Sequence, residues 1–436
     1  MAGTRTRAAL PAPSLEIERH TLSNGLRVVL APDAAAPSVV VEVRYDVGFR
    51  SEPEGRTGFA HLFEHLLFEG SHSLEKLQHA SLVQANGGVF NGNTTPDATQ
   101  YFEALPPNAL ELGLFLEADR MRSARLDDET LANQIGVVKE EIKVNVLNRP
   151  YGGFPWILLP PVLYTSFNNS HNGYGSFVDL DNATVEAAAA FFRAYYAPGN
   201  AVLVVAGAFK PDEALAMIER QFGDIPAGKV PKRPSFAEAR PDSERRALQP
   251  DPRATLNATA LGYRVPDPVK KFDDYLAALL GIDVLADGTP SRLHQRLVTG
   301  DRLAVEVAGY AGTFGEVYAQ RDPVISQFLI FHPGPVEPVL AAFDEEVHRA
   351  AAGVSAEELE RVVIASAAQH LRAIDDLQNR AMLLAALEQV HGRTELVNDL
   401  PAHLLAVTPE AVAAAIGTWF ATDRRAVLQI VPGAEA

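Results

Sequence analysis

Short apolar runs in the sequence predict β-strands in both halves of the chain. Residues 26–31 (LRVVLA) and 38–47 (SVVVEVRYDV) are rich in β-branched side chains, and the second run largely alternates apolar and polar positions. Residues 201–206 (AVLVVA) form a continuous apolar run typical of a buried strand, and 254–263 is also strand-like. The polar segment 89–104, rich in Thr and Asn, is expected to be extended.

Longer stretches carry apolar residues at helical spacing. The breaker Asn86-Gly87-Gly88 separates one of these stretches from the extended segment that follows it. A second break, Gly288-Thr289-Pro290, interrupts another. The predicted helical stretches are 58–70, 74–85, 110–121, 127–148, 183–196, 211–222, 272–298 and 357–390, the last as one or two helices.

The second half of the chain repeats the plan of the first. Residues 408–433 echo 183–208, because each has an Ala-rich helix, an aromatic pair, a short turn and a buried strand ending at Gly. Residues 226–252 contain six prolines mixed with charges and are predicted to be a linker. We therefore predict an α+β protein with two similar α/β sandwich domains, 14–225 and 253–436. Each has about 200 residues, with helices packed on a mostly antiparallel sheet.

Composition narrows the functional classes. At 436 residues and 47% hydrophobic content, the chain can bury a large core, and its net charge of −17 argues against nucleic acid as a partner. The acidic surface either favours basic or neutral substrates or serves solubility alone. No cysteine is present, which excludes disulfides, thiolate metal ligands and cysteine nucleophiles.

The sequence shows no apolar run of the roughly 18 residues that a membrane span needs. The amino-terminal segment 1–17 has two arginines but no signal-peptide core, so a cytoplasmic protein is expected, with a short transit peptide as the alternative.

The helix 58–70, GFAHLFEHLLFEG, carries the strongest candidate chemistry. On a helix, positions i and i+4 lie on one face about 5–6 Å apart at Cβ, so His61 and His65 can bind one ion. Glu64 points to the same side. The opposite face is an apolar stripe formed by Phe59, Leu62, Phe63, Leu66 and Leu67. One face is thus suited to packing and the other to metal chemistry, although a solvated polar surface would show the same pattern.

A catalytic zinc site needs a third protein ligand and one open position. The helical stretch 127–148 offers two adjacent carboxylates, Glu140 and Glu141. Its buried stripe consists of Leu131, Ile135, Val138 and Ile142. Glu141 borders this stripe and can turn inward, whereas Glu140 falls on the far side. We predict Glu141 as the third ligand; an ordinary surface Glu-Glu pair is the alternative.

These motifs resemble those of the pitrilysin family of inverted-motif (HxxEH) zinc metallopeptidases, which includes insulin-degrading enzyme and the mitochondrial processing peptidase. HLFEH is followed by Glu141 in VVKEEIK. NGGVFNGNTTPDATQYF is similar to the family's substrate-strand segment, and FFRAYYAPGNAVLVVAG to a further family strand. The chain length resembles the processing-peptidase branch.

The resemblance implies a zinc endopeptidase that holds one Zn²⁺ per chain through His61, His65 and Glu141. Glu64 would be the general base that activates water. The strand 89–93 (Val89, Phe90 and Asn91 among its residues) would pair with an extended peptide substrate, with Asn91 helping to hold its backbone. The peptide would lie in a chamber between two domains.

The sequence departs from the family pattern at two places. The family usually has a second glutamate one heptad before the third ligand, where this chain has Gln134, so zinc is expected to be held more loosely. In the second half, Arg296 matches a family substrate-binding Arg, but Val305 stands at the place of a Tyr. Tyr310 or Tyr318 could substitute for it.

We favour a heterodimer in which a paralogous subunit without zinc supplies the Arg/Tyr pair, with a homodimer as the fallback. A non-catalytic scaffold or binding subunit of the same fold is the main alternative to a peptidase. The complete set of His61, Glu64, His65 and Glu141 favours the enzyme. An oxygenase or another hydrolase using the same ion is disfavoured by the zinc-type spacing and the local base.

Overall fold

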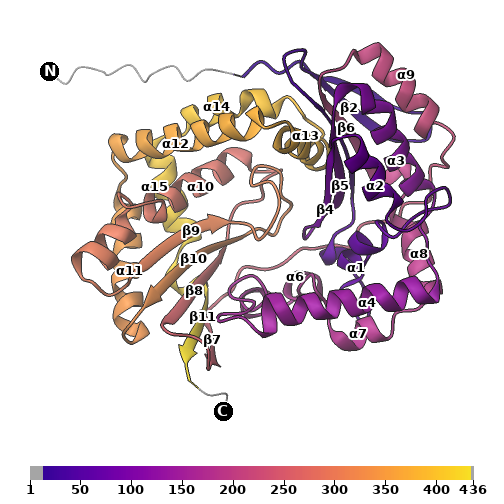
Figure 1. Ribbon diagram of the computed structural model, residues 1–436. Helices are drawn as coiled ribbons and strands as arrows, with labels where there is room; N and C mark the ends of the chain where they lie inside the picture. The colour runs from indigo at the N-terminus through magenta and orange to yellow at the C-terminus, as the bar shows by residue number, and fades with distance from the viewer. Residues whose placement is uncertain (1–12, 434–436) are drawn as a thin grey trace.

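The computed structural model describes residues 13–433 and contains two β-sheets, each covered by helices (Figure 1). The first-half sheet has the strand order β1-β2-β6-β3-β5-β4, and the second-half sheet has the order β7-β11-β8-β10-β9. Only the pairs β2–β6 and β7–β11 are parallel within these sheets. The predicted α+β architecture with mostly antiparallel sheets is therefore confirmed.

The first-half sheet is built from the apolar runs that the sequence shows. Its strands are β1 (Glu18–Thr21), β2 (Arg27–Pro32), β3 (Val39–Tyr45), β4 (Val89–Thr94), β5 (Thr99–Leu105) and β6 (Ala201–Gly207). Strands β3 and β6 are buried along their whole length. The segment expected to be extended is a hairpin of β4 and β5, closed by a turn in which Thr95 N–H donates to the carbonyl of Ala98. β4 lies at the edge of the sheet.

The first-half helices are α1 (Phe59–Leu66), α2 (Gln78–Ala85), α3 (Leu110–Arg122), α4 (Asp128–Ile142), α5 (Pro160–Leu163), α6 (Phe167–Ser170), α7 (Phe177–Asp181), α8 (Val185–Tyr195) and α9 (Pro211–Phe222). A π-helical turn, Lys143–Leu147, continues α4. Helices α1 and α3 pack on one face of the sheet, where they share a core with the odd-numbered positions of β3. This packing places α1 and α4 side by side at the end of the sheet near β4 (Figure 1).

The second half repeats this arrangement. Its strands are β7 (Arg245–Asp251), β8 (Asn257–Arg264), β9 (Glu306–Ala311), β10 (Ile325–His332) and β11 (Ala426–Pro432), and its helices are α10 (Phe272–Ala286), α11 (Val336–Ala352), α12 (Ala356–Asp375), α13 (Leu377–His391), α14 (Leu396–Ala406) and α15 (Pro409–Trp419). The predicted repeat corresponds to α8–β6 in the first half and α15–β11 in the second. β6 and β11 each lie between one parallel and one antiparallel neighbour.

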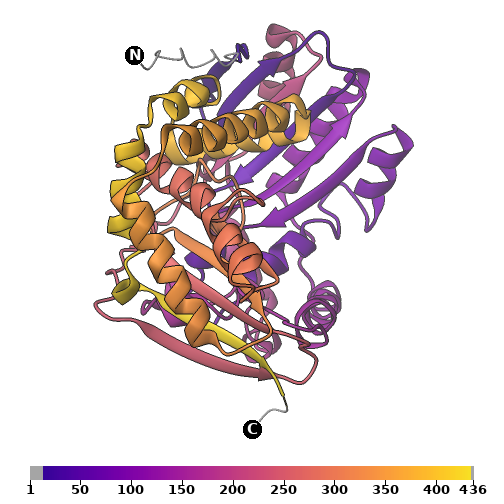
Figure 2. The ribbon, with the colours of Figure 1, turned by 90° about the vertical axis from the view of Figure 1, so that its left-hand side faces the viewer.

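Each half also contributes an element to the other half's sheet. Helix α13 packs on the face of the first-half sheet opposite α3, against buried residues such as Val40, Val202 and Val204 (Figures 1 and 2). Conversely, Leu159 and Leu163 from the first half join a core on the second-half sheet. Apolar packing therefore interlocks the two halves, whereas the sequence predicted only a linker between them.

The proline-rich segment predicted as a linker at 226–252 is only partly irregular. Its residues 245–251 form strand β7, which pairs in parallel with β11, so the predicted boundary is wrong at this end. Pro250 fits there because β7 is an edge strand. Further upstream, Phe236 is buried and the guanidinium of Arg50 lies 4.7 Å from its ring centroid. The segment is therefore anchored at Phe236 and along β7.

Two predicted helices are shorter than their sequence patterns indicate. The helix predicted at 58–70 ends at Leu66, because the N–H groups of Phe68 and Glu69 donate three residues back and the chain turns. The helix predicted from residue 74 begins at Gln78, after Leu77 adopts a left-handed backbone with φ 65°.

Within residues 13–433, no single helix is long and apolar enough to cross a membrane, although the pair α14 and α15, bent by 94°, has sufficient length and composition together. Most of the segment considered as a transit peptide, residues 1–12, lies outside the described residues, as do residues 434–436 of the second predicted domain.

Candidate metal centre and active site

Helix α1 is fixed at its amino end by a buried carboxylate. Glu52 accepts hydrogen bonds from the N–H groups of Gly58 and Ala60, at 2.9 and 2.7 Å. A negative charge at a helix amino terminus is stabilised by the free N–H groups and by the helix dipole. The predicted apolar stripe is buried, since Phe59, Leu62, Phe63, Leu66 and Leu67 are each at most 4% exposed. The opposite face, with His61 and His65, is thereby directed away from the core.

Helix α4 brings the third predicted residue to the same place. Its amino end is capped by Asp127, whose side chain accepts a hydrogen bond from Thr130 N–H. Leu131, Val138 and Ile142 are buried. The Glu141 side chain is 29% exposed and turns toward α1, whereas Glu140 is 65% exposed and pairs with Lys143. The structure therefore separates the two carboxylates as the sequence pattern predicts.

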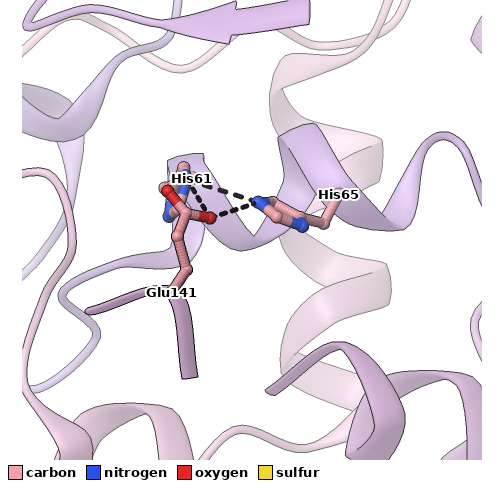
Figure 3. A group of neighbouring side chains, drawn as sticks. All are labelled: His61, His65 and Glu141. Carbon is pink, nitrogen blue, oxygen red and sulfur yellow. Dashed lines mark hydrogen bonds and ion pairs between the residues drawn. The ribbon is translucent and has the colours of Figure 1, made fainter. Parts of the chain in front are cut away.

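His61, His65 and Glu141 converge on one point (Figure 3). The Nε2 atoms of the two histidines are 3.3 Å apart. Glu141 Oε2 lies 3.7 Å from His61 Nε2 and 3.4 Å from His65 Nε2. A tetrahedral zinc site with bonds of about 2.0–2.1 Å separates its ligand atoms by roughly 3.3–3.4 Å. The three donor atoms therefore fit a zinc ion in both chemistry and spacing.

The electrostatics of this group favour the protonation states that a metal ion requires. Burial, aided by the charge of His65, lowers the pKa of His61 to about 4, so its ring is neutral at neutral pH. The hydrogen bond with His65 is the largest cause that lowers the pKa of Glu141, to about 2, so this carboxylate is ionised. Neutral imidazole and ionised carboxylate are the forms that bind metal.

Glu64 lies beside the three-residue group in a cavity of about 370 Å³. Its Oε2 accepts a hydrogen bond of 2.7 Å from the hydroxyl of Thr94 on β4. Burial raises the pKa of Glu64, and the Thr94 hydrogen bond acts in the opposite direction. The cavity is lined by Phe49, His61, Glu64, Asn93, Thr94, Trp156, Gly173, Tyr174 and Phe314. A carboxylate with a raised pKa in such a cavity can exchange a proton with a neighbouring group.

Seven of the nine cavity residues were not singled out from the sequence: Phe49, Asn93, Thr94, Trp156, Gly173, Tyr174 and Phe314. Phe314 comes from the loop after β9 in the second half, and its ring lies 5.5 Å from that of Trp156. Among the described residues, no group donates a hydrogen bond to the buried Oδ1 atom of Asn93. Of these seven residues, Asn93 and Thr94 had a sequence signal, because both lie in the segment that resembles the family's substrate strand.

Other predicted residues lie outside this cavity. Asn91 is exposed on β4, and its side chain accepts a hydrogen bond from Gly92 N–H. Val89 is 61% exposed, whereas Phe90 packs inward against Phe68. Gln134 is buried on α4, seven residues before Glu141.

The second-half residues considered for substrate binding are not brought to the cavity. Arg296 pairs with Glu345 at 2.9 Å and with Asp301. Val305 and Tyr310 are exposed, at 53% and 38%. Tyr318 packs near His370. None of these residues lines the cavity that contains Glu64.

A second cluster of possible ligand atoms lies in the first-half core. His79, Glu103 and Glu117 are buried and close together, but the guanidinium of Arg120 lies among them. Arg120 Nη2 is 3.1 Å from His79 Nε2 and 3.3 Å from Glu117 Oε1. The arginine therefore supplies the cation that this cluster needs, and we interpret it as a structural ion-pair network.

Comparisons with known proteins identify the family. The family model "Insulinase (Peptidase family M16)" matches residues 27–150, and the model "Peptidase M16 inactive domain" matches residues 182–365. The protein named zinc protease PqqE from Helicobacter pylori is 31% identical over 298 residues, which span 66% of this chain and 65% of that protein.

Solved structures agree with these matches. The structure of a protease from Helicobacter pylori superposes with a TM-score of 0.86 at 25% identity, covering 96% of this chain and all of that one. The periplasmic protease PqqL from Escherichia coli shares the fold, with a TM-score of 0.76 at 20% identity. The match covers 98% of this chain but 48% of PqqL. The chain belongs to the M16 family of pitrilysin-like peptidases, so the family that the motifs indicate is confirmed.

Proposed function

We propose that this chain is a zinc-dependent endopeptidase that hydrolyses peptides or unfolded segments. The observation that carries this proposal is the convergence of His61 Nε2, His65 Nε2 and Glu141 Oε2, with Glu64 beside them in a cavity. The geometry suits the chemistry that the name zinc protease implies for the Helicobacter pylori relative.

The residues of the site suggest how hydrolysis proceeds. A zinc ion held by His61, His65 and Glu141 would polarise the scissile carbonyl and lower the pKa of a water molecule. Glu64 takes one proton from the attacking water as the water oxygen forms a bond to the carbonyl carbon. When the carbon–nitrogen bond breaks, Glu64 delivers that proton to the leaving amine. Thr94 orients Glu64 through its hydrogen bond.

Strand β4 offers a way to bind the peptide. It is the edge of the first-half sheet, so one side of its backbone has no strand partner in the described residues. An extended peptide can add to such an edge through main-chain hydrogen bonds, with little dependence on sequence. Residues Val89, Phe90 and Asn91 would supply these bonds and direct the peptide past Thr94 toward Glu64.

Metal analysis and activity together test the proposed function. The purified chain should contain about one zinc per chain, as a three-residue ligand set predicts. It should cleave an unstructured quenched-fluorescent peptide, either alone or with the second subunit proposed below. A zinc chelator should stop cleavage, and added zinc should restore it. A protein that neither retains zinc nor binds it on titration would contradict the proposal.

The non-catalytic alternative also has an observation in its favour. The match to the model named "inactive domain" covers residues 182–365, all of them after the metal-binding candidates. A scaffold or binding subunit of this fold need not retain zinc or Glu64. Zinc at about one per chain together with a rate that depends on Glu64 would exclude this alternative.

We further propose that a second subunit completes the site. Within residues 13–433, no tyrosine of the second half lines the cavity, and Val305 cannot donate a hydrogen bond to a developing oxyanion. The match covering only 48% of PqqL supports the idea that two units of this size work together. The partner would be a paralogous chain without zinc that supplies an Arg/Tyr pair, with a second copy of this chain as the fallback. Peptide would be enclosed in a chamber between two domains.

Adding the paralogue should raise the peptidase rate by about 100-fold or more, because one missing oxyanion donor costs about 10²–10³ in rate. The measurement compares the purified chain, the paralogue and their equimolar mixture on one peptide. The mixture should also elute as a larger species than either component. Full activity of this chain alone as a homodimer would contradict the heterodimer proposal and leave the peptidase proposal intact.

A further inference from the structure

The two oxygens of the Glu141 carboxylate have different partners. Oε2 faces the Nε2 atoms of His61 and His65. Oε1 points away from them and accepts a hydrogen bond of 2.9 Å from the hydroxyl of Tyr174. The amide of Asn145 lies farther from the same oxygen, at 3.5 Å. One oxygen is thus free for a metal ion, and the other is held by Tyr174.

Tyr174 is itself fixed against the helix that carries the two histidines. A Cβ on Gly58, which precedes α1 with φ 86°, would lie 2.5 Å from the Tyr174 carbonyl oxygen, so this close approach depends on glycine. The N–H of Ser176 donates to the hydroxyl of Thr57 at 3.0 Å. The Tyr174 ring meets that of His61 nearly edge-on, with centroids 5.0 Å apart. Tyr174 therefore links α1 to Glu141 on α4.

We propose that Tyr174 is a positioning residue that holds Glu141 as a ligand through Oε2 alone. This inference rests on the proposed zinc site. A carboxylate with both oxygens free can rotate or bind through both, which would occupy the position that a water molecule needs. The hydrogen bond from Tyr174 removes Oε1 from that competition. Gln134 makes no hydrogen bond to Glu141 within residues 13–433, so Tyr174 provides the support in its place.

Zinc affinity of the variant Tyr174→Phe tests this role directly. The substitution removes one hydroxyl and keeps the ring that packs on His61. We expect zinc binding, measured by competition with a chromophoric chelator, to weaken by about 10-fold or more, as for other groups that orient metal ligands. Tyr310→Phe is the matched control, because it removes a tyrosine hydroxyl outside the cavity, and it should bind zinc like the wild type. Asn145→Ala should weaken binding less than Tyr174→Phe.

A spectroscopic measurement distinguishes positioning from a general structural role. In the cobalt-substituted protein, Tyr174→Phe should weaken the visible absorption bands, because Glu141 then binds through both oxygens and raises the coordination number. The metal-free wild type and the metal-free Tyr174→Phe variant should have the same unfolding temperature. Wild-type zinc affinity and cobalt bands in Tyr174→Phe would overturn the inference, as would a larger loss in Asn145→Ala. Failure of the wild-type chain to bind zinc would instead overturn the proposed function.

Discussion

The variant Glu64→Gln is expected to lose peptide hydrolysis by about two to four orders of magnitude, the contribution typical of a general base. Glutamine has nearly the shape of glutamate and can still contact the hydroxyl of Thr94, but it cannot take a proton from water. Glu64 does not belong to the group of converging ligand atoms, so its replacement should leave His61, His65 and Glu141 in place. The expected result is a zinc-loaded protein with very low activity.

Zinc content, unfolding temperature and kcat/KM should be measured on the same preparation of Glu64→Gln, with the partner subunit present if the wild type requires it. Glu111→Gln provides the control, because Glu111 is an exposed glutamate on α3 that pairs with Arg220 far from the motif. This control should retain wild-type activity. Turnover by Glu64→Gln at the wild-type rate would remove the base assignment, and loss of zinc would show that Glu64 also supports the metal site.

The sequence predicted which side chains converge at the candidate site, because short-range geometry determines their positions. His61, Glu64 and His65 lie on one helix, so the helical repeat alone puts them on one side and the apolar stripe on the other. The choice of Glu141 over Glu140 followed from the same periodicity on α4. Both elements are regular helices anchored by a buried apolar face, which is the condition under which the helical pattern is most informative.

The rest of the cavity could not be predicted, because it depends on contacts between segments far apart in the chain. Trp156 and Phe314 meet in the cavity lining although they come from irregular segments of different halves. Tyr174 reaches Glu141 only because the chain turns at Gly58 and Gly175, both with positive φ, and packs closely there. None of these positions has a periodic pattern or a motif that marks it.

Local sequence patterns also do not predict that the two halves interlock. The pattern predicts α13 as a helix but does not show that it packs on the first-half sheet. The ion pair between Arg50 and Asp97 illustrates the consequence, since Arg50 also donates to the carbonyl oxygens of Arg321 and Pro323 in the second half. These contacts hold the loop that carries Phe314 beside the first half. The cavity wall therefore depends on both halves being folded together.

The substitution Glu141→Gln is expected to weaken zinc affinity. The loss should exceed the roughly 10–100-fold that results from changing a group that only orients a ligand. The amide oxygen of glutamine carries no charge, and its NH₂ group can turn toward the histidines in place of the oxygen. Peptide hydrolysis should fall with the zinc content and recover in part when excess zinc is added. Zinc affinity by chelator competition and activity at several zinc concentrations measure both effects.

Glu140→Gln is a closely matched control for this experiment, because it makes the same chemical change one residue earlier on the same helix. Glu140 is exposed and pairs only with Lys143 in the described residues, so its replacement should change neither zinc affinity nor activity. The contrast tests geometry directly, since only the helical phase relative to the buried stripe distinguishes the two glutamates. Equal zinc affinity in both variants would show that Glu141 is not a ligand, and the two histidines would then need another partner.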